Sequence, residues 1–218
     1  MPPRKDATTT STRDAVFQAA ASLFSAKGFD GVSVDDIAAG AAVNKAMIYY
    51  HFTDKLTLYR AVVGDMLSAV GQRVSSIAQD EAAPPVKLDR FIENFVRLAD
   101  ERPWFPTLML REISEGAPHL DIDTLANIRN VFLGFGRILK EGEAAGVFRK
   151  IHPVLAYTSI IGPLIMNAAR ERVAAQPGRQ NLPMLVAISH DDLIAHGQET
   201  ARRMLATDFP GPQKAQNQ

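Results

Sequence analysis

The chain has 218 residues, a formal net charge of zero and no cysteine. This length fits one large domain or two small ones. The lack of cysteine excludes a disulfide framework, a thiol nucleophile and a cysteine-ligated zinc site. The sequence shows neither a signal-peptide pattern nor an apolar run long enough to span a bilayer, so we expect a cytoplasmic protein without a membrane partner.

The N-terminal part of the chain predicts a flexible arm followed by a helix. Residues 1–10 are rich in Thr, Pro and charge and show no hydrophobic periodicity. Ser11 or Thr12 can cap the helix, which Gly28 ends in a position suited to a left-handed cap. Phe29 then follows at a position where it can contact Phe24, which is the hydrophobic contact typical of a Schellman motif.

Two short helices separated by a tight turn come next. Ser33 caps the first of them, and Asp36 three residues later completes a capping-box pattern. Asn44 caps the second, and Thr53 caps a long helix that continues to about residue 79. Helices this short are not stable alone, so we expect them to pack on the helix before Gly28.

The remainder of the chain predicts five more helices, which makes about nine in total, and no strand. Hydrophobic residues recur at helical spacing, and Pro and Gly mark the breaks. The predicted helices cover residues 86–101, 103–114, 121–145, 153–175 and 183–206. We therefore expect an all-α chain.

The block from Arg13 to Leu58 resembles the TetR family of bacterial transcriptional regulators. The matching motif is S-V-x-x-I-A followed by A-V-N-K-x-x-I-Y-Y-H-F-T-D-K. The resemblance implies a three-helix DNA-binding domain with a helix-turn-helix at residues 1–55, including the flexible arm at 1–10. It also implies a larger helical domain for effector binding and dimerisation at 56–207, followed by a disordered tail at 208–218.

The resemblance places the second helix of the helix-turn-helix in the major groove of double-stranded operator DNA. The implied DNA-binding residues near base edges are Asn44, Lys45, Ala46 and Met47. Those touching phosphates or bases are Tyr49, Tyr50 and His51, and those touching phosphates are Ser33 and Lys55. The family usually has glycine in the turn where this chain has Ala42. If the backbone there needs a positive φ, alanine costs about 1 kcal/mol.

The resemblance also implies a small-molecule effector and a homodimer. Effector pockets are mostly apolar with few polar groups, although aromatic residues and methionines at helical spacing are more often ordinary core. The candidate pocket residues are Phe95, Trp104, Phe105, Met109, Arg111, Glu112, Phe132, Phe135, Tyr157, Met166 and Asn167, with His119 and Arg170 as further polar candidates. The candidate dimer interface is the apolar stripe Leu193, Ile194, Gly197, Ala201, Met204 and Leu205.

No motif predicts a catalytic site, a metal or a cofactor. His190 and His196 are six residues apart, which puts them on opposite faces of a helix. We therefore predict that the chain is not an enzyme but a repressor that binds a palindromic operator and is released by a small apolar or amphipathic effector. The alternative is a ligand-binding or interaction protein of the same fold without sequence-specific DNA binding. The neutral N-terminal unit, with six basic residues and six aspartates in residues 1–55, leaves that alternative open.

Overall fold

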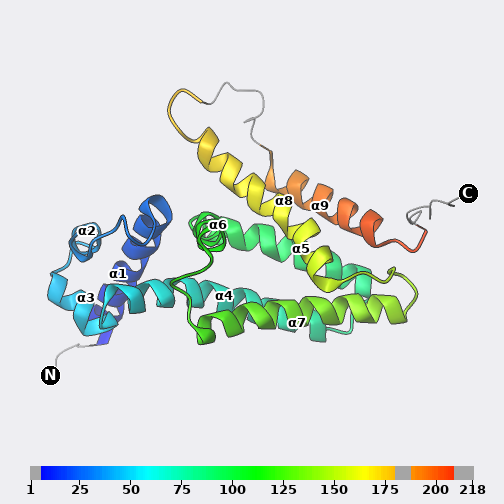
Figure 1. Ribbon diagram of the computed structural model, residues 1–218, viewed down its shortest axis with the longest axis horizontal. Coiled ribbons are helices and arrows are strands. Elements are labelled where there is room, and N and C mark those ends of the chain that lie inside the picture. Colours follow the sequence, from blue (N-terminus) through cyan, green and yellow to red (C-terminus); the bar gives the residue numbers. More distant parts are fainter. Residues whose placement is uncertain (1–5, 180–187, 209–218) are drawn as a thin grey trace, which may run out of the picture. The chain divides into compact units, whose positions relative to one another are not determined.

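The computed structural model describes residues 6–179 and 188–208, which form nine α-helices and no strand, as predicted (Figure 1). Residues 1–5 of the predicted arm, residues 183–187 of the predicted last helix and residues 209–218 of the predicted tail lie outside the described residues. The helices are α1 (Asp6–Lys27), α2 (Val34–Gly40), α3 (Lys45–Phe52), α4 (Lys55–Gln79), α5 (Pro84–Glu101), α6 (Phe105–Glu115), α7 (Ile122–Ala144), α8 (Pro153–Ala174) and α9 (His190–Leu205).

The observed helix boundaries differ from the predicted ones mainly at α1 and α9. The α1 helix begins at Asp6, so the prediction that it begins after Ser11 or Thr12 was wrong, and residues 6–10 are helical. The α9 helix begins at His190 and not near residue 183, because the Ser189 hydroxyl caps it by accepting the Asp192 N–H at 3.1 Å.

The described residues form two compact units that share α4 and α7. Unit 1 contains the chain up to Ala69 together with Glu101–Ile128. Unit 2 contains Val70–Asp100 and the chain from Arg129. Unit 1 therefore holds α1, α2, α3, α6 and the beginnings of α4 and α7. The functional division into residues 1–55 and 56–207 stays a prediction.

The helix-turn-helix in unit 1 has a continuous apolar core. The α1 helix contributes Val16, Ala20 and Phe24, which have no exposed surface. Ile37 of α2 and Ile48 of α3 are also fully buried, and both helices pack against α1. Each short helix is thus stabilised by an apolar face packed against its neighbours, as its length requires.

Unit 2 has an aromatic core that joins three of its helices. The ring of Phe91 lies 4.7 Å from that of Phe135, and Tyr157 lies 4.5 Å from Phe132 and 5.8 Å from Phe135, measured between centroids. Helices α8 and α9 run side by side in this unit (Figure 1). The core of unit 2 therefore connects α5, α7 and α8 through aromatic residues.

Candidate nucleic-acid interface

The start of α2 has the predicted capping box. The Ser33 hydroxyl accepts the Asp36 N–H at 3.0 Å, and Asp36 Oδ2 accepts the Ser33 N–H at 2.8 Å and the Ser33 hydroxyl proton at 2.7 Å. These hydrogen bonds from Ser33 lower the pKa of the Asp36 carboxyl below its usual range. Ser33, a predicted phosphate contact, is therefore held in position by its own helix.

The turn between α2 and α3 requires the unusual backbone conformation anticipated for Ala42. Ala42 has a φ of 53°, in the left-handed region that glycine occupies without strain. Asn44 then caps α3 as predicted, because its side-chain oxygen accepts the Ala46 N–H at 2.9 Å. The chain thus completes the helix-turn-helix with a strained alanine instead of glycine.

The predicted cap of α4 was assigned to the wrong residue. Thr53 has a φ of 26°, whereas Asp54 Oδ1 accepts the Thr57 N–H at 2.6 Å. Asp54 is therefore the residue that caps α4. Its hydrogen bonds to Thr57 lower the pKa of its carboxyl.

Helix α3 separates a buried face from an exposed face. Ile48 and Phe52 are buried, whereas Asn44, Lys45 and Ala46 are exposed. Tyr50 is 74% exposed and Tyr49 is 47% exposed, whereas Met47 and His51 are half-buried and the Nε2 atom of His51 is buried. The exposed face of α3 therefore combines polar side chains with the aromatic rings of Tyr49 and Tyr50.

Two lysines of the predicted interface already have partners within the chain. Lys45 Nζ donates to Asp35 Oδ2 of α2 at 3.0 Å, and this hydrogen bond raises the pKa of Lys45. Lys55 Nζ donates to the carbonyl oxygens of Phe29 and Val32, at 3.0 Å each. A lysine has three N–H donors, so two of those on Lys55 stabilise the loop between α1 and α2.

The predicted pocket residues of unit 1 have internal roles. Phe105 and Met109 are buried, and the Trp104 ring lies 6.2 Å from that of Phe105. Arg111 lies against the end of α1, where a Cβ added to Gly28 would be 2.5 Å from its Nη1. Glu112, the last of the predicted pocket residues in unit 1, is the most buried charged residue among those described.

Glu112 joins a polar and aromatic cluster that the sequence did not predict. The Tyr59 hydroxyl donates to Glu112 Oε1, and His119 Nδ1 lies 2.8 Å from the same oxygen. Burial, together with the hydrogen bond to Glu112, raises the pKa of Tyr59 far above its usual range, so Tyr59 remains a donor. Tyr59 and Glu112 are 53 positions apart in the chain, so no local pattern could have paired them.

The predicted pocket residues of unit 2 are divided between core and surface. Phe132, Phe135 and Tyr157 lie together in the aromatic core, and burial raises the pKa of Tyr157 to about 12. Asn167 bonds to Glu171 and Arg170 on its own helix, and Phe95 is half-buried. Met166 is 63% exposed in the single chain, so it lies on the surface, and its role in a pocket stays a prediction.

The predicted dimer stripe on α9 contains both buried and half-buried residues, and its role in a dimer stays a prediction. Ile194, Ala201 and Leu205 are buried within the chain itself, and a Cβ added to Gly197 would lie 3.1 Å from Ile92. Buried side chains leave no surface for a partner subunit, so Ile194, Ala201 and Leu205 belong to the inner face of α9. Leu193, Gly197 and Met204 are half-buried.

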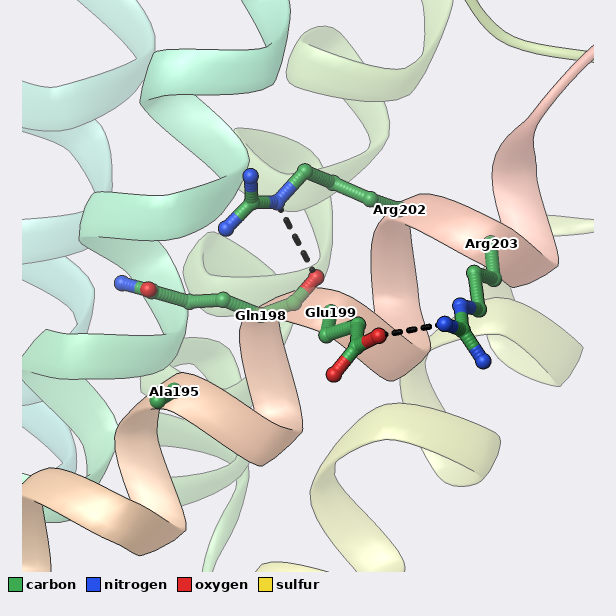
Figure 2. Close-up of a pocket in the computed structure, with 5 residues that line it drawn as sticks. All are labelled: Ala195, Gln198, Glu199, Arg202 and Arg203. Carbon is green, nitrogen blue, oxygen red and sulfur yellow. Dashed lines mark hydrogen bonds and ion pairs between the residues drawn. The ribbon is translucent and has the colours of Figure 1, made fainter.

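The outer face of α9 is polar and slightly hollowed. A surface depression of about 390 Å³ is lined by Ala195, Gln198, Glu199, Arg202 and Arg203 (Figure 2). Its charges are paired, because Arg203 lies 2.5 Å from Glu199 and Arg202 lies 3.1 Å from Asp89. The depression is therefore not the apolar effector pocket expected from the sequence.

The described part of the chain shows no group of three or more His, Cys, Asp or Glu residues that could hold a metal ion. In the same residues, no helix is long and apolar enough to cross a membrane.

Comparison with known proteins supports the structural assignment. Residues 16–62 match the family model "Bacterial regulatory proteins, tetR family", and residues 84–177 match "Tetracyclin repressor-like, C-terminal domain". The chain is 29% identical over 140 residues to the HTH-type transcriptional repressor NicS of Pseudomonas putida, a match that covers 63% of this chain and 66% of NicS. It is 43% identical over 51 residues to the negative transcriptional regulator IcaR of Staphylococcus aureus, covering 23% of this chain and 27% of IcaR. The chain thus spans less than two thirds of the length of either relative.

Solved structures show the same fold. PfmR from Thermus thermophilus, a TetR family transcriptional regulator, superposes with a TM-score of 0.69 at 23% identity, covering 86% of this chain and 97% of that one. FadR from Bacillus halodurans, a fatty acid degradation regulator, superposes with a TM-score of 0.68 at 15% identity, covering 88% of this chain and 94% of that one. The two family models together match most of the chain, and the motif residues predicted from the sequence form a helix-turn-helix with an exposed second helix. The chain belongs to the TetR family of bacterial transcriptional regulators.

Proposed function

We propose that the chain is a transcriptional repressor that binds a palindromic operator as a homodimer and is released by a small apolar or amphipathic effector. The observation that carries this proposal is the exposed face of α3, where Asn44, Lys45 and Tyr50 project from a helix fixed by buried Ile48 and Phe52. Reading helices of this kind present base-contacting residues from their N-terminal end. NicS is named a repressor and IcaR a negative regulator, which supports repression.

The proposed DNA contacts keep the predicted set and refine the role of each residue. Asn44, Lys45, Ala46 and Met47 face base edges, while Ser33, Tyr49, Tyr50, His51 and Lys55 face phosphates or bases. To contact DNA, Lys45 Nζ has to break its hydrogen bond to Asp35 and donate to a DNA acceptor instead. Lys55 has one N–H donor available after its hydrogen bonds to two carbonyl oxygens. Binding should therefore be weak for one subunit and should require two.

The exposed apolar residues of α8 support a homodimer. Val154, Leu155 and Met166 are 46%, 61% and 63% exposed in the single chain, and large apolar side chains at such positions are typical of subunit contacts. We propose that this face of α8 and the outer face of α9 form the interface. In such a dimer the two reading helices have to match half-sites a whole number of helical turns apart, about 34–36 Å per turn.

The aromatic core of unit 2 is the proposed region of effector binding. An effector that opens a space among Phe132, Phe135 and Tyr157 would contact apolar rings and one hydroxyl, which suits an apolar or amphipathic molecule. Effector binding releases DNA only to the extent that the effector prefers the conformer with low operator affinity. A thermal-shift screen of apolar and amphipathic compounds, with and without operator, would identify a molecule that stabilises the free protein and destabilises the complex.

Selection from a pool of randomised duplexes at moderate salt tests the proposal directly. We expect enrichment of a palindrome bound by two subunits, and loss of enrichment when Tyr50 and Asn44 are replaced by alanine. If the folded wild-type chain enriches no site, the repressor proposal fails. The chain would then be a ligand-binding or interaction protein of the same fold.

A further inference from the structure

The carboxylate of Glu112 is buried within unit 1. The Glu112 side chain is 1% exposed, and its Oε1 accepts the Tyr59 hydroxyl of α4 and faces His119 Nδ1 at 2.8 Å. An isolated buried carboxylate is strongly destabilising, and removal of one partner leaves that penalty uncompensated. Glu112 therefore holds Tyr59 and His119 in fixed positions, and they hold Glu112 in return.

The same cluster reaches the loop that leads into the helix-turn-helix. The Phe29 ring lies 4.2 Å from the His119 ring and 5.2 Å from the Tyr59 ring, between centroids. Lys55 Nζ lies 4.1 Å from the centroid of the Phe29 ring, and it bonds to the carbonyl of Val32, the residue before the cap of α2. The half-buried Phe29 thus contacts side chains from α4 and from the segment between α6 and α7.

Two further contacts fix the segment around Glu112. Arg111 lies against Gly28 at the C-terminal end of α1, where a cation is favoured by the helix dipole. Arg60 of α4 donates to the carbonyl oxygen of His119 at 2.9 Å and lies 3.5 Å from Asp121. Helix α6 and the following segment are therefore tied to both α1 and α4.

We propose that Glu112 is a positioning residue for operator binding: together with Tyr59 and His119 it fixes Phe29, and through Phe29 the start of α2, in the orientation that presents α3. The proposal rests on the proposed DNA-binding function. It makes α6 and residues 116–121 part of the body that carries the reading helix.

Hydrogen exchange of the full-length protein without DNA tests the first step. In Glu112→Leu, exchange of the amides of residues 29–33 should rise at least about tenfold, because loss of the carboxylate removes the shared acceptor that holds His119 and Tyr59. Exchange in α8 and α9 should stay unchanged. Glu115→Gln, which neutralises an exposed carboxylate on the same helix, is the matched control and should change neither region.

Operator binding tests the second step, with the palindrome obtained by duplex selection as the probe. Glu112→Leu should weaken operator binding at least about tenfold. Glu112→Gln keeps the shape of the side chain and an acceptor oxygen, so its operator affinity should stay close to that of the wild type. If Glu112→Leu fails to fold, Tyr59→Phe replaces it, because it removes the hydroxyl that Glu112 accepts and keeps the ring. Faster exchange of residues 29–33 in Tyr59→Phe is then expected, and unchanged exchange would overturn the proposal.

The two measurements separate the inference from the function on which it rests. Unchanged exchange at residues 29–33 overturns the inference whether or not DNA binds. Faster exchange with unaltered operator affinity also overturns it, because the loop would then not position α3. If the wild-type chain selects no DNA site, the proposed function fails, and the inference about operator binding fails with it. The exchange result still reports whether Glu112 fixes the loop.

Discussion

Replacing Lys55 with methionine should lower the free energy of unfolding by about 2.5–3 kcal/mol, in the absence of DNA. Lys55 Nζ makes two 3.0 Å hydrogen bonds to the carbonyl oxygens of Phe29 and Val32 and a contact with the Phe29 ring. A hydrogen bond to a charged group contributes about 1.5–3 kcal/mol. Because Lys55 is only partly buried, we take about 1 kcal/mol for each bond and about 0.5–1 kcal/mol for the ring contact.

Chemical denaturation followed by far-UV circular dichroism measures this change. Protein concentration must be matched between variants, because the stability of a dimer depends on it. Methionine keeps the apolar stem of lysine and removes the ammonium group. The matched control is Lys27→Met: the Lys27 side chain is 52% exposed and lies 3.9 Å from Asp36, so its loss should change stability by less than about 0.5 kcal/mol. A similarly small effect for Lys55→Met would refute the reasoning.

The same variant reports separately on the proposed phosphate contact. The dependence of the logarithm of operator affinity on the logarithm of salt concentration should become shallower by about 0.9, the contribution of one phosphate contact. Affinity should fall alike for all DNA sequences. A slope equal to that of the wild type would assign Lys55 to the loop alone.

Three other substitutions follow from individual contacts. Gly142→Ala should destabilise the fold by about 3 kcal/mol or more, measured by denaturation, because the added Cβ would lie 1.8 Å from the ring of Phe148. Ala42→Gly should leave stability within about 0.5 kcal/mol, since relief of about 1 kcal/mol of strain is offset by greater entropy of the unfolded chain. Asp35→Asn should tighten binding to all duplexes severalfold and steepen the salt dependence in titrations, because it releases Lys45 and removes a negative charge beside the DNA.

Each of these predictions has a control or a contrary outcome. Gly136→Ala changes another glycine of α7 with no atom within 4 Å of the new Cβ, so it should be neutral or stabilising. A loss of more than about 1 kcal/mol in Ala42→Gly would contradict the assignment of strain to the turn. For Asp35→Asn the comparison is Asp30→Asn, an exposed aspartate in the loop before α2. Equal effects of the two changes would show that only net charge matters.

The local features of the helix-turn-helix were predictable because neighbouring residues determine them. The capping box at Ser33 and the cap at Asn44 depend on side chains two or three positions away along the chain. The positive φ at Ala42 follows from the sharpness of the turn, and the burial of Ile48 and Phe52 follows from their spacing of four. The error at Thr53 has the same origin, since Asp54 is an equally good cap and only the backbone decides between the two.

The orientation of whole helices in unit 2 was less predictable. On α9, one apolar stripe could face either its own chain or a partner, and the sequence does not distinguish these two environments. The structure buries Ile194 and Ala201 against the chain itself, whereas α8 exposes Leu155 and Met166. An almost uniformly apolar helix such as α8 has no polar face to reveal its orientation.

Long-range polar contacts were not predictable, and they change the interpretation of the interface most. From the sequence alone, Glu112 is expected to be a solvated charge or a pocket residue. In the structure it is buried and contacts Tyr59 and His119, which come from other parts of the chain. From the sequence alone, Lys55 is likewise expected to be a free cation at a helix N-terminus. In the structure its Nζ donates to carbonyl oxygens 23 and 26 residues away along the chain. Because a buried carboxylate is tolerated only with its partners in place, we expect the conformation of the loop before α2 to depend on α6. In the proposed operator complex, α6 therefore helps to position the helix-turn-helix.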